Sequence, residues 1–153
     1  MKKVKIETFN IIGIAVITTN ENGQAGKDIG ALWHTFTTEG IIEKIPNKID
    51  NTVYAIYTDY ESDHTKPYTT LLGCKVESLN EIPKGMTGKI MEGGNYTKFT
   101  AKGDISEGLL IYKTWENIWQ IDLDRRYTAD YEVYGDKAQD PTDAEIDILI
   151  AIH

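Results

Sequence analysis

The order of the predicted elements occurs twice along the 153 residues, and it constrains the fold more than any other feature of the chain. Each half begins with a strand and a loop, continues through a tryptophan-bearing helix and a tyrosine-rich strand, and ends with a polar turn and an apolar strand. Trp33 corresponds to Trp115, YAIYTDY to DYEVYGD, and TTLLGCKV to EIDILIAI, although few residues are identical. We therefore predict an α+β fold of two pseudo-symmetric βαββ units, which form a curved antiparallel sheet with two helices and a central ligand cleft.

Hydrophobic periodicity and clusters of glycine, proline and polar residues set the predicted boundaries. Strands are predicted over 3–19 with a bulge or kink at Gly13, over 51–60 with a hairpin partner at 68–76, as a strand pair within 85–100 with its turn at 92–95, around Glu132, and over 145–152. The first helix is predicted over 28–45 with an irregular C-terminal part. The second is predicted to open at Asp104, which forms a capping-box pattern with Glu107, and to end near Gln120.

Length and composition limit the classes of function. A chain of 153 residues fits one domain, 1–153, with halves of approximately 1–80 and 81–153. A net charge of −8 argues against direct nucleic-acid binding, which needs a basic face. The single cysteine, Cys74, excludes an internal disulfide, so a cytoplasmic protein with a buried cysteine is expected. No membrane span, metal site or cofactor is expected, because no apolar run approaches ~18 residues and the three histidines lie far apart.

Glu132 is the candidate functional residue, because it interrupts a run of aromatic and β-branched strand residues. Alternation along a strand places Asp130, Glu132 and Tyr134 on one face. If that face is solvated, Glu132 is an ordinary surface residue. If it lines a cavity, the carboxyl group must shift its pKa or bind a cation. Asp147 is a second acidic candidate, as an additional negative group, a surface residue or, less favoured, the partner of Glu132 in a glycosidase-like dyad.

The helices and strands also offer aromatic candidates for the walls of a cleft. Trp115 and Trp119 lie one turn apart on a helix face, so at least one of them should touch what fills the cleft. Trp33, on the first helix, is either a wall or a core residue. Alternation places Tyr57 on the opposite face from Tyr54 and Tyr60, and the sequence does not say which face is the cleft.

The chain resembles the effector-binding domain superfamily over almost its whole length. The resemblance rests on the order of VYAIYTDYESDHTKPYTTLLGCKV, IPKGM, the W-x-x-I-W of Trp115 to Trp119, DYEVYGD and EIDILIAI. The superfamily includes the gyrase-inhibitory protein, the drug-binding domains of multidrug-responsive transcription activators, and stand-alone effector-binding proteins from integron gene cassettes. The stand-alone integron group is the most similar in length and motif.

The resemblance implies a bacterial protein whose cleft binds lipophilic cationic small molecules through a buried glutamate and aromatic residues. Glu132 matches that glutamate, and the helix tryptophans match Trp115 and Trp119. The other candidate ligand contacts are Tyr134, Trp33, Tyr57 and Tyr68. Members often end in an acid-x-aromatic-x-Pro pattern, whereas this chain has Asp147, Leu149 and Ala151, so a tyrosine contact near the last strand is expected to be missing.

Three functions are compatible with this resemblance. The favoured one is a ligand sensor or an accessory to transcriptional regulation that acts with a separate regulator, since the sequence lacks the helix-turn-helix domain of the activators. The first alternative is a hydrolase of reactive cyclopropane-containing compounds, in which Glu132 would activate water. The second is a protein-interaction module like the gyrase-inhibitory relatives, in which the acidic surface is the functional part.

Overall fold

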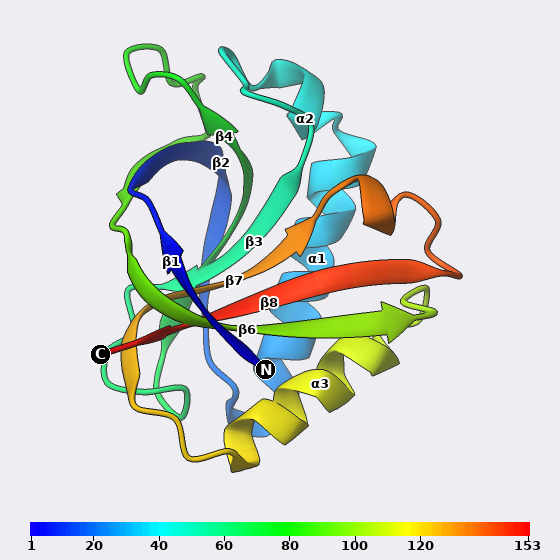
Figure 1. Cartoon of the computed structure of the whole chain (residues 1–153). Helices are drawn as coiled ribbons and strands as arrows, with labels where there is room; N and C mark the ends of the chain where they lie inside the picture. The colour runs from blue at the N-terminus through cyan, green and yellow to red at the C-terminus, as the bar shows by residue number, and fades with distance from the viewer.

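The computed structural model describes all 153 residues and contains one eight-stranded sheet with helices packed against it (Figure 1). The strands are β1 (Lys2–Ile6), β2 (Phe9–Thr18), β3 (Val53–Thr58), β4 (Tyr68–Val76), β5 (Thr87–Met91), β6 (Gly94–Gly103), β7 (Arg125–Tyr134) and β8 (Ala144–Ile152). The helices are α1 (Gln24–Thr38), α2 (Ile41–Lys44) and α3 (Leu109–Gln120), with short 3-10 turns η1 (Glu21–Gly23) and η2 (Asp136–Ala138). No helix is both long enough and apolar enough to cross a membrane.

The sheet is built from two similar halves that meet at its centre. Its strand order is β1-β6-β8-β7-β3-β4-β2-β5, and every neighbouring pair is antiparallel. One half contains β2, α1, β3 and β4, and the other contains β6, α3, β7 and β8, with β3 and β7 paired between them. The prediction of an α+β fold with two βαββ units in a curved antiparallel sheet is therefore confirmed.

The two halves exchange their first strands, which the sequence did not reveal. β1 pairs with β6 of the other half, and β5 pairs with β2. The single strand predicted over 3–19 is therefore wrong, because the chain bends at Glu7 and Thr8 to pass between the halves. The strand pair predicted within 85–100 is also wrong, because β5 and β6 have different partners and lie far apart in the strand order.

Gly13 lies where two strands approach each other closely, and it does not form a bulge. The register of β2 with β4 is unbroken from Asn10 to Thr18, and Gly13 lies opposite Gly73. A Cβ atom on Gly13 would lie 1.9 Å from the backbone oxygen of Leu72. Only glycine can therefore occupy this position without moving the neighbouring strand.

The two long helices begin at residues other than those predicted. α1 begins at Gln24, before the predicted start, and its irregular end is a break at Gly40, which has a φ of 59°. The capping box at Asp104 is wrong, because the Asp104 carboxylate accepts hydrogen bonds from the backbone N and Oγ of Ser106. This local turn satisfies Asp104 before a helix can form, and α3 starts only after Gly108.

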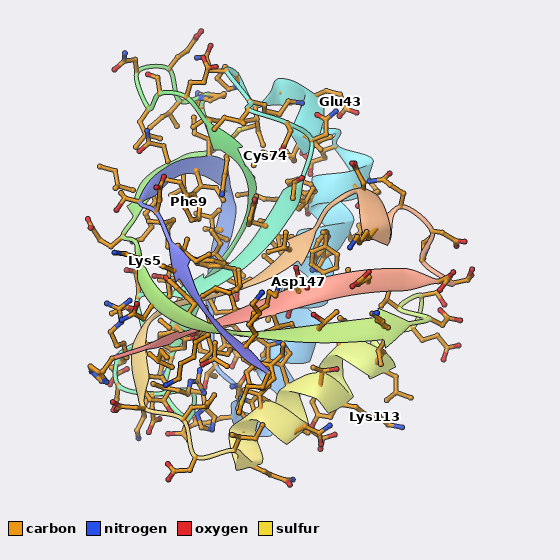
Figure 2. The ribbon with its side chains drawn as sticks, in the orientation of Figure 1. Lys5, Phe9, Glu43, Cys74, Lys113 and Asp147 are labelled. Carbon is orange, nitrogen blue, oxygen red and sulfur yellow. The ribbon has the colours of Figure 1, made fainter.

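The two long helices cover the same face of the sheet, one over each half. Residues of α1 pack on Ala55 and Leu72, while residues of α3 pack on Ile148 and Ile150. The opposite face closes on itself as the sheet curls, and Phe9 packs inside this curl (Figure 2). Cys74 is fully buried under α1, as predicted. The helix-covered face over β3 and β7 is therefore the place where the halves can form a common site.

Candidate functional site

Glu132 lies in the middle of the sheet, on the face covered by the helices. Its neighbours in register are Ala55 on β3 and Ile148 on β8. Only 2% of Glu132 is exposed, so it is a buried carboxyl group and not a surface residue. Burial of an ionised carboxylate costs free energy unless the group is paired or hydrogen-bonded.

Three neutral side chains donate hydrogen bonds to Glu132. Trp115 Nε1 and the Tyr57 hydroxyl donate to Oε2, at 2.7 Å and 2.8 Å. The Tyr134 hydroxyl donates to Oε1 at 2.5 Å. No lysine, arginine or histidine forms a salt bridge with Glu132. The site therefore stabilises a carboxylate through hydrogen bonds while leaving its charge without a counter-ion.

Burial and hydrogen bonding act on the pKa of Glu132 in opposite directions. Desolvation raises this pKa, whereas the hydrogen bonds from Tyr134, Trp115 and Tyr57 lower it, and the net pKa lies above the usual value of 4.5. Burial and the nearby carboxylate raise the pKa of Tyr57 and of Tyr134 well above 10. Both tyrosines therefore remain protonated donors, and Glu132 is the group of this cluster that titrates most readily.

A cavity of about 790 Å³ lies next to this cluster, lined by residues of α1 and α3 and by aromatic residues of β3 and β4. Five of the seven predicted ligand contacts line it, namely Trp33, Tyr57, Tyr68, Trp115 and Trp119. Glu132 itself is not exposed to the cavity. It lies beneath two of the lining side chains, Tyr57 and Trp115, which donate to its Oε2.

Tyr134, the remaining predicted contact, lines a second cavity of about 500 Å³. Trp33 borders both cavities, and its ring meets that of Tyr134 edge-on at 5.0 Å between centroids. The two oxygens of Glu132 are thus held from different sides. Oε2 is held by residues of the larger cavity and Oε1 by a residue of the smaller one.

Tyr60 lines the larger cavity together with Tyr57, which strand alternation did not predict. β3 ends at Thr58, and Asp59 has a φ of 50°. A left-handed residue interrupts the extended backbone, so the alternation of faces ends there. The Tyr60 ring packs on that of Tyr68 at 5.6 Å. The sequence signal at this turn is the residue type of Asp59, because aspartate tolerates a positive φ.

A buried ion pair borders the same cavity and was also missed. Arg125 Nη2 lies 2.8 Å from Asp130 Oδ2, and their side chains are 6% and 0% exposed. Asp130 also accepts hydrogen bonds from the Tyr60 hydroxyl at 2.6 Å and from the backbone N of Ala151 at 2.9 Å. Burial raises the pKa of Asp130, although Arg125 opposes this shift. An irregularity in the pairing of β7 with β8 between Arg125 and Asp130 brings the two side chains together.

Asp147 lies on the opposite face of the sheet from Glu132. It pairs in register with Val133 and accepts a hydrogen bond from Thr100 Oγ1 at 2.9 Å. A dyad of Asp147 with Glu132 is therefore excluded by geometry. Leu149 also faces away from Glu132, because its register partner is Tyr131, so an aromatic residue at this position would not reach the larger cavity.

Comparisons with known proteins give consistent results. The model of the family described as Cass2, integron-associated effector binding protein, matches residues 4–152. YobU of Bacillus subtilis (strain 168), a predicted transcriptional regulator protein, is 30% identical over 106 residues, which are 67% of this chain and 65% of YobU. The integron cassette protein VCH_CASS2 from the mobile metagenome of Vibrio cholerae has a similar structure, with a TM-score of 0.74, 24% identity, and coverage of 99% of this chain and 95% of that one. The structure of SAV2435 bound to tetraphenylphosphonium is similar at a TM-score of 0.80, with 16% identity and coverage of 99% and 93%.

Proposed function

Since the chain belongs to the family of integron-associated effector binding proteins, we propose that it binds lipophilic cations in the larger cavity, with Glu132 as the charge partner. The observation that carries this proposal is the buried carboxylate of Glu132, which has three neutral donors and no cationic partner. The fold neighbour SAV2435 has been solved with tetraphenylphosphonium, which is a ligand of this chemical class.

The charge of Glu132 acts on the cavity through a single layer of side chains. Tyr57 and Trp115 lie between the carboxylate and the cavity, so a bound cation would sit ~6 Å from the negative charge. With an effective dielectric constant of about 20, this separation corresponds to an attraction of about 3 kcal/mol. A neutral ligand of the same shape gains none of this energy, so the site selects for positive charge.

The aromatic residues contribute to the same selection. A cation over the face of tryptophan or tyrosine is attracted by the ring quadrupole. The hydroxyl of Tyr57 donates to a carboxylate, which increases the electron density of its ring and strengthens this attraction. The rings of Tyr57 and Trp115 meet edge-on at 5.5 Å, so they offer differently oriented surfaces to the phenyl groups of a ligand. A bulky aromatic cation therefore satisfies both requirements of the site.

The test is a titration of the wild type and Glu132→Gln with tetraphenylphosphonium, followed by tryptophan fluorescence. All three tryptophans line the larger cavity, so binding should change their emission. Glutamine preserves the shape and hydrogen bonds of the site, because its oxygen can accept from Tyr57 and Trp115 while its amide donates to the Tyr134 hydroxyl. An attraction of about 3 kcal/mol corresponds to roughly a hundredfold loss of affinity in the variant.

Two controls separate charge from shape. Asp147→Asn removes a negative charge from the opposite face of the sheet and should change the affinity by less than about threefold. Triphenylphosphine oxide, a neutral compound with three of the four phenyl groups, should bind wild type and Glu132→Gln equally. Equal binding of tetraphenylphosphonium to wild type and Glu132→Gln would refute the proposal.

The geometry favours binding over hydrolysis. A general base must reach the water that it activates, directly or through one further water. In this chain both oxygens of Glu132 accept hydrogen bonds, and Tyr57 and Trp115 separate the carboxylate from the cavity. A hydrolase would instead form product from a cyclopropane-containing substrate and lose this activity in Glu132→Gln. A protein-interaction module would be unaffected by Glu132→Gln and sensitive to reversal of surface charge.

For the biological output of binding, we propose that the ligand-bound chain acts on a separate transcription regulator. The relation to YobU supports this proposal. In cells that express the chain, a reporter of the regulated promoter should respond to tetraphenylphosphonium. The same response in cells that express Glu132→Gln would contradict it.

A further inference from the structure

The larger cavity has a second polar feature in addition to the Glu132 cluster. Arg125 and His64 both line it. Arg125 donates one side-chain hydrogen bond, from Nη2 to Asp130, so the other N–H groups of its guanidinium have no protein partner. A charged donor of this kind at the wall of a cavity points to a ligand group that accepts a hydrogen bond there.

Both side chains are held firmly in place. The Arg125 side chain is 6% exposed and forms an ion pair with Asp130, and its Cζ lies 4.3 Å above the centre of the Tyr127 ring. The His64 ring stacks on Trp119 at 5.5 Å between centroids. The backbone oxygen of His64 accepts a hydrogen bond from Asn20 Nδ2 at 2.8 Å. A donor that is already oriented loses little entropy when it binds a ligand.

Arg125 does not oppose the binding of a cation, because Asp130 compensates its charge. The pair contributes no net charge, so Glu132 remains the one buried carboxylate of the site without a cationic partner, and the exposed Glu107 at the cavity wall adds a second negative charge. Asp130 and Glu132 are two residues apart on one face of β7, which corresponds to about 7 Å. One drug-sized molecule can therefore place its positive charge near Glu132 and still reach the free donor of Arg125.

We propose that Arg125 donates a hydrogen bond to a carbonyl oxygen of the ligand, so that the preferred ligands are lipophilic cations that carry an ester or amide group. This inference rests on the proposed cation site at Glu132. A carbonyl oxygen suits the site because it accepts from a free N–H of the Arg125 guanidinium without adding a negative charge that would offset the attraction to Glu132. His64 lines the same cavity and offers a second polar side chain to the ligand.

The experiment compares rhodamine B ethyl ester with tetraethylrosamine, which share one xanthylium cation and differ in the ester group. Fluorescence anisotropy gives a dissociation constant for each dye. A charge-assisted hydrogen bond predicts that the wild type binds the ester at least about tenfold more tightly. The double variant Arg125→Met/Asp130→Asn removes both charges of the ion pair together, so no unpaired charge remains buried, and methionine offers no hydrogen-bond donor. In this variant the ratio of the two constants should fall to about one.

Arg126→Met is the matched control, because the Arg126 side chain lies against Gly94 and does not line the cavity. It should retain the wild-type ratio. A wild-type ratio near one overturns the inference, and so does an ester preference that persists unchanged in the double variant. If the double variant does not fold, the wild-type ratio alone decides. Rosamine binding that requires Glu132 but shows no ester preference refutes only this inference, whereas no saturable binding of either dye refutes the proposed function as well.

Discussion

Replacing Tyr134 with phenylalanine is expected to shift the pH at which the chain loses affinity for a lipophilic cation. Tyr134 donates to Glu132 Oε1 but does not line the larger cavity, so the substitution should act on ligand binding only through the carboxyl group. The phenyl ring would keep its edge-on contact with Trp33. This variant therefore isolates the ionisation of Glu132 from the shape of the cavity.

The sign and size of the shift follow from the hydrogen bond. The carboxylate attracts the cation and the protonated acid does not, so affinity falls as the pH falls through the pKa of Glu132. Burial places this pKa above 4.5, and the Tyr134 hydrogen bond lowers it. A hydrogen bond to a charged group contributes about 1.5–3 kcal/mol. Because one pKa unit is about 1.4 kcal/mol, the midpoint should move upward by about one to two pH units in Tyr134→Phe.

The assay is a series of tetraphenylphosphonium titrations between about pH 4.5 and 9, followed by tryptophan fluorescence, for wild type and Tyr134→Phe. Well above both midpoints the two affinities should agree within about twofold, since the carboxylate is then charged in both proteins. Tyr54→Phe is the matched control, because Tyr54 lies on the opposite face of the sheet and should leave the midpoint unchanged. An unchanged midpoint in Tyr134→Phe, or an equal loss of affinity at every pH, would refute the reasoning.

Two further predictions concern stability. The raised pKa of Glu132 means that the fold disfavours the charged form, so wild type should lose stability as the pH rises from 4.5 through this pKa, by about 1.4 kcal/mol per unit of the shift. Glu132→Gln does not titrate and should gain stability relative to wild type over that window, which urea unfolding at pH 4 and pH 8 would detect. Gly13→Ala should cost about 3 kcal/mol or more, because its Cβ would lie 1.9 Å from the Leu72 oxygen. Gly26→Ala, at an open position of α1, should instead stabilise by about 0.5–1 kcal/mol, and similar unfolding midpoints for the two alanine variants would contradict this packing argument.

The sequence anticipated the features that depend on local periodicity. Alternation along β7 placed Glu132 and Tyr134 on one face, and the twice-repeated order of elements predicted the two βαββ units. It failed where the chain departs from regular geometry over one or two residues. Asp59 turns Tyr60 toward the larger cavity, and the Asp104 turn delays the start of α3. Each departure is decided by a local backbone conformation that hydrophobic patterning does not report.

The chain's own pattern of residues determined its secondary structure, its internal symmetry and the unusual position of a glutamate within an apolar strand. Only the tertiary structure decided that α3 buries this glutamate and that Tyr57, 75 residues away in the sequence, donates a hydrogen bond to it. It likewise decided that Asp147 lies on the opposite face of the sheet. It also decided the exchange of β1 and β5 between the halves and the pairing of Arg125 with Asp130 beside the same cavity. The physical reason is that a face of a strand is encoded by neighbouring residues, whereas the groups that cover that face come from distant segments and are selected by packing.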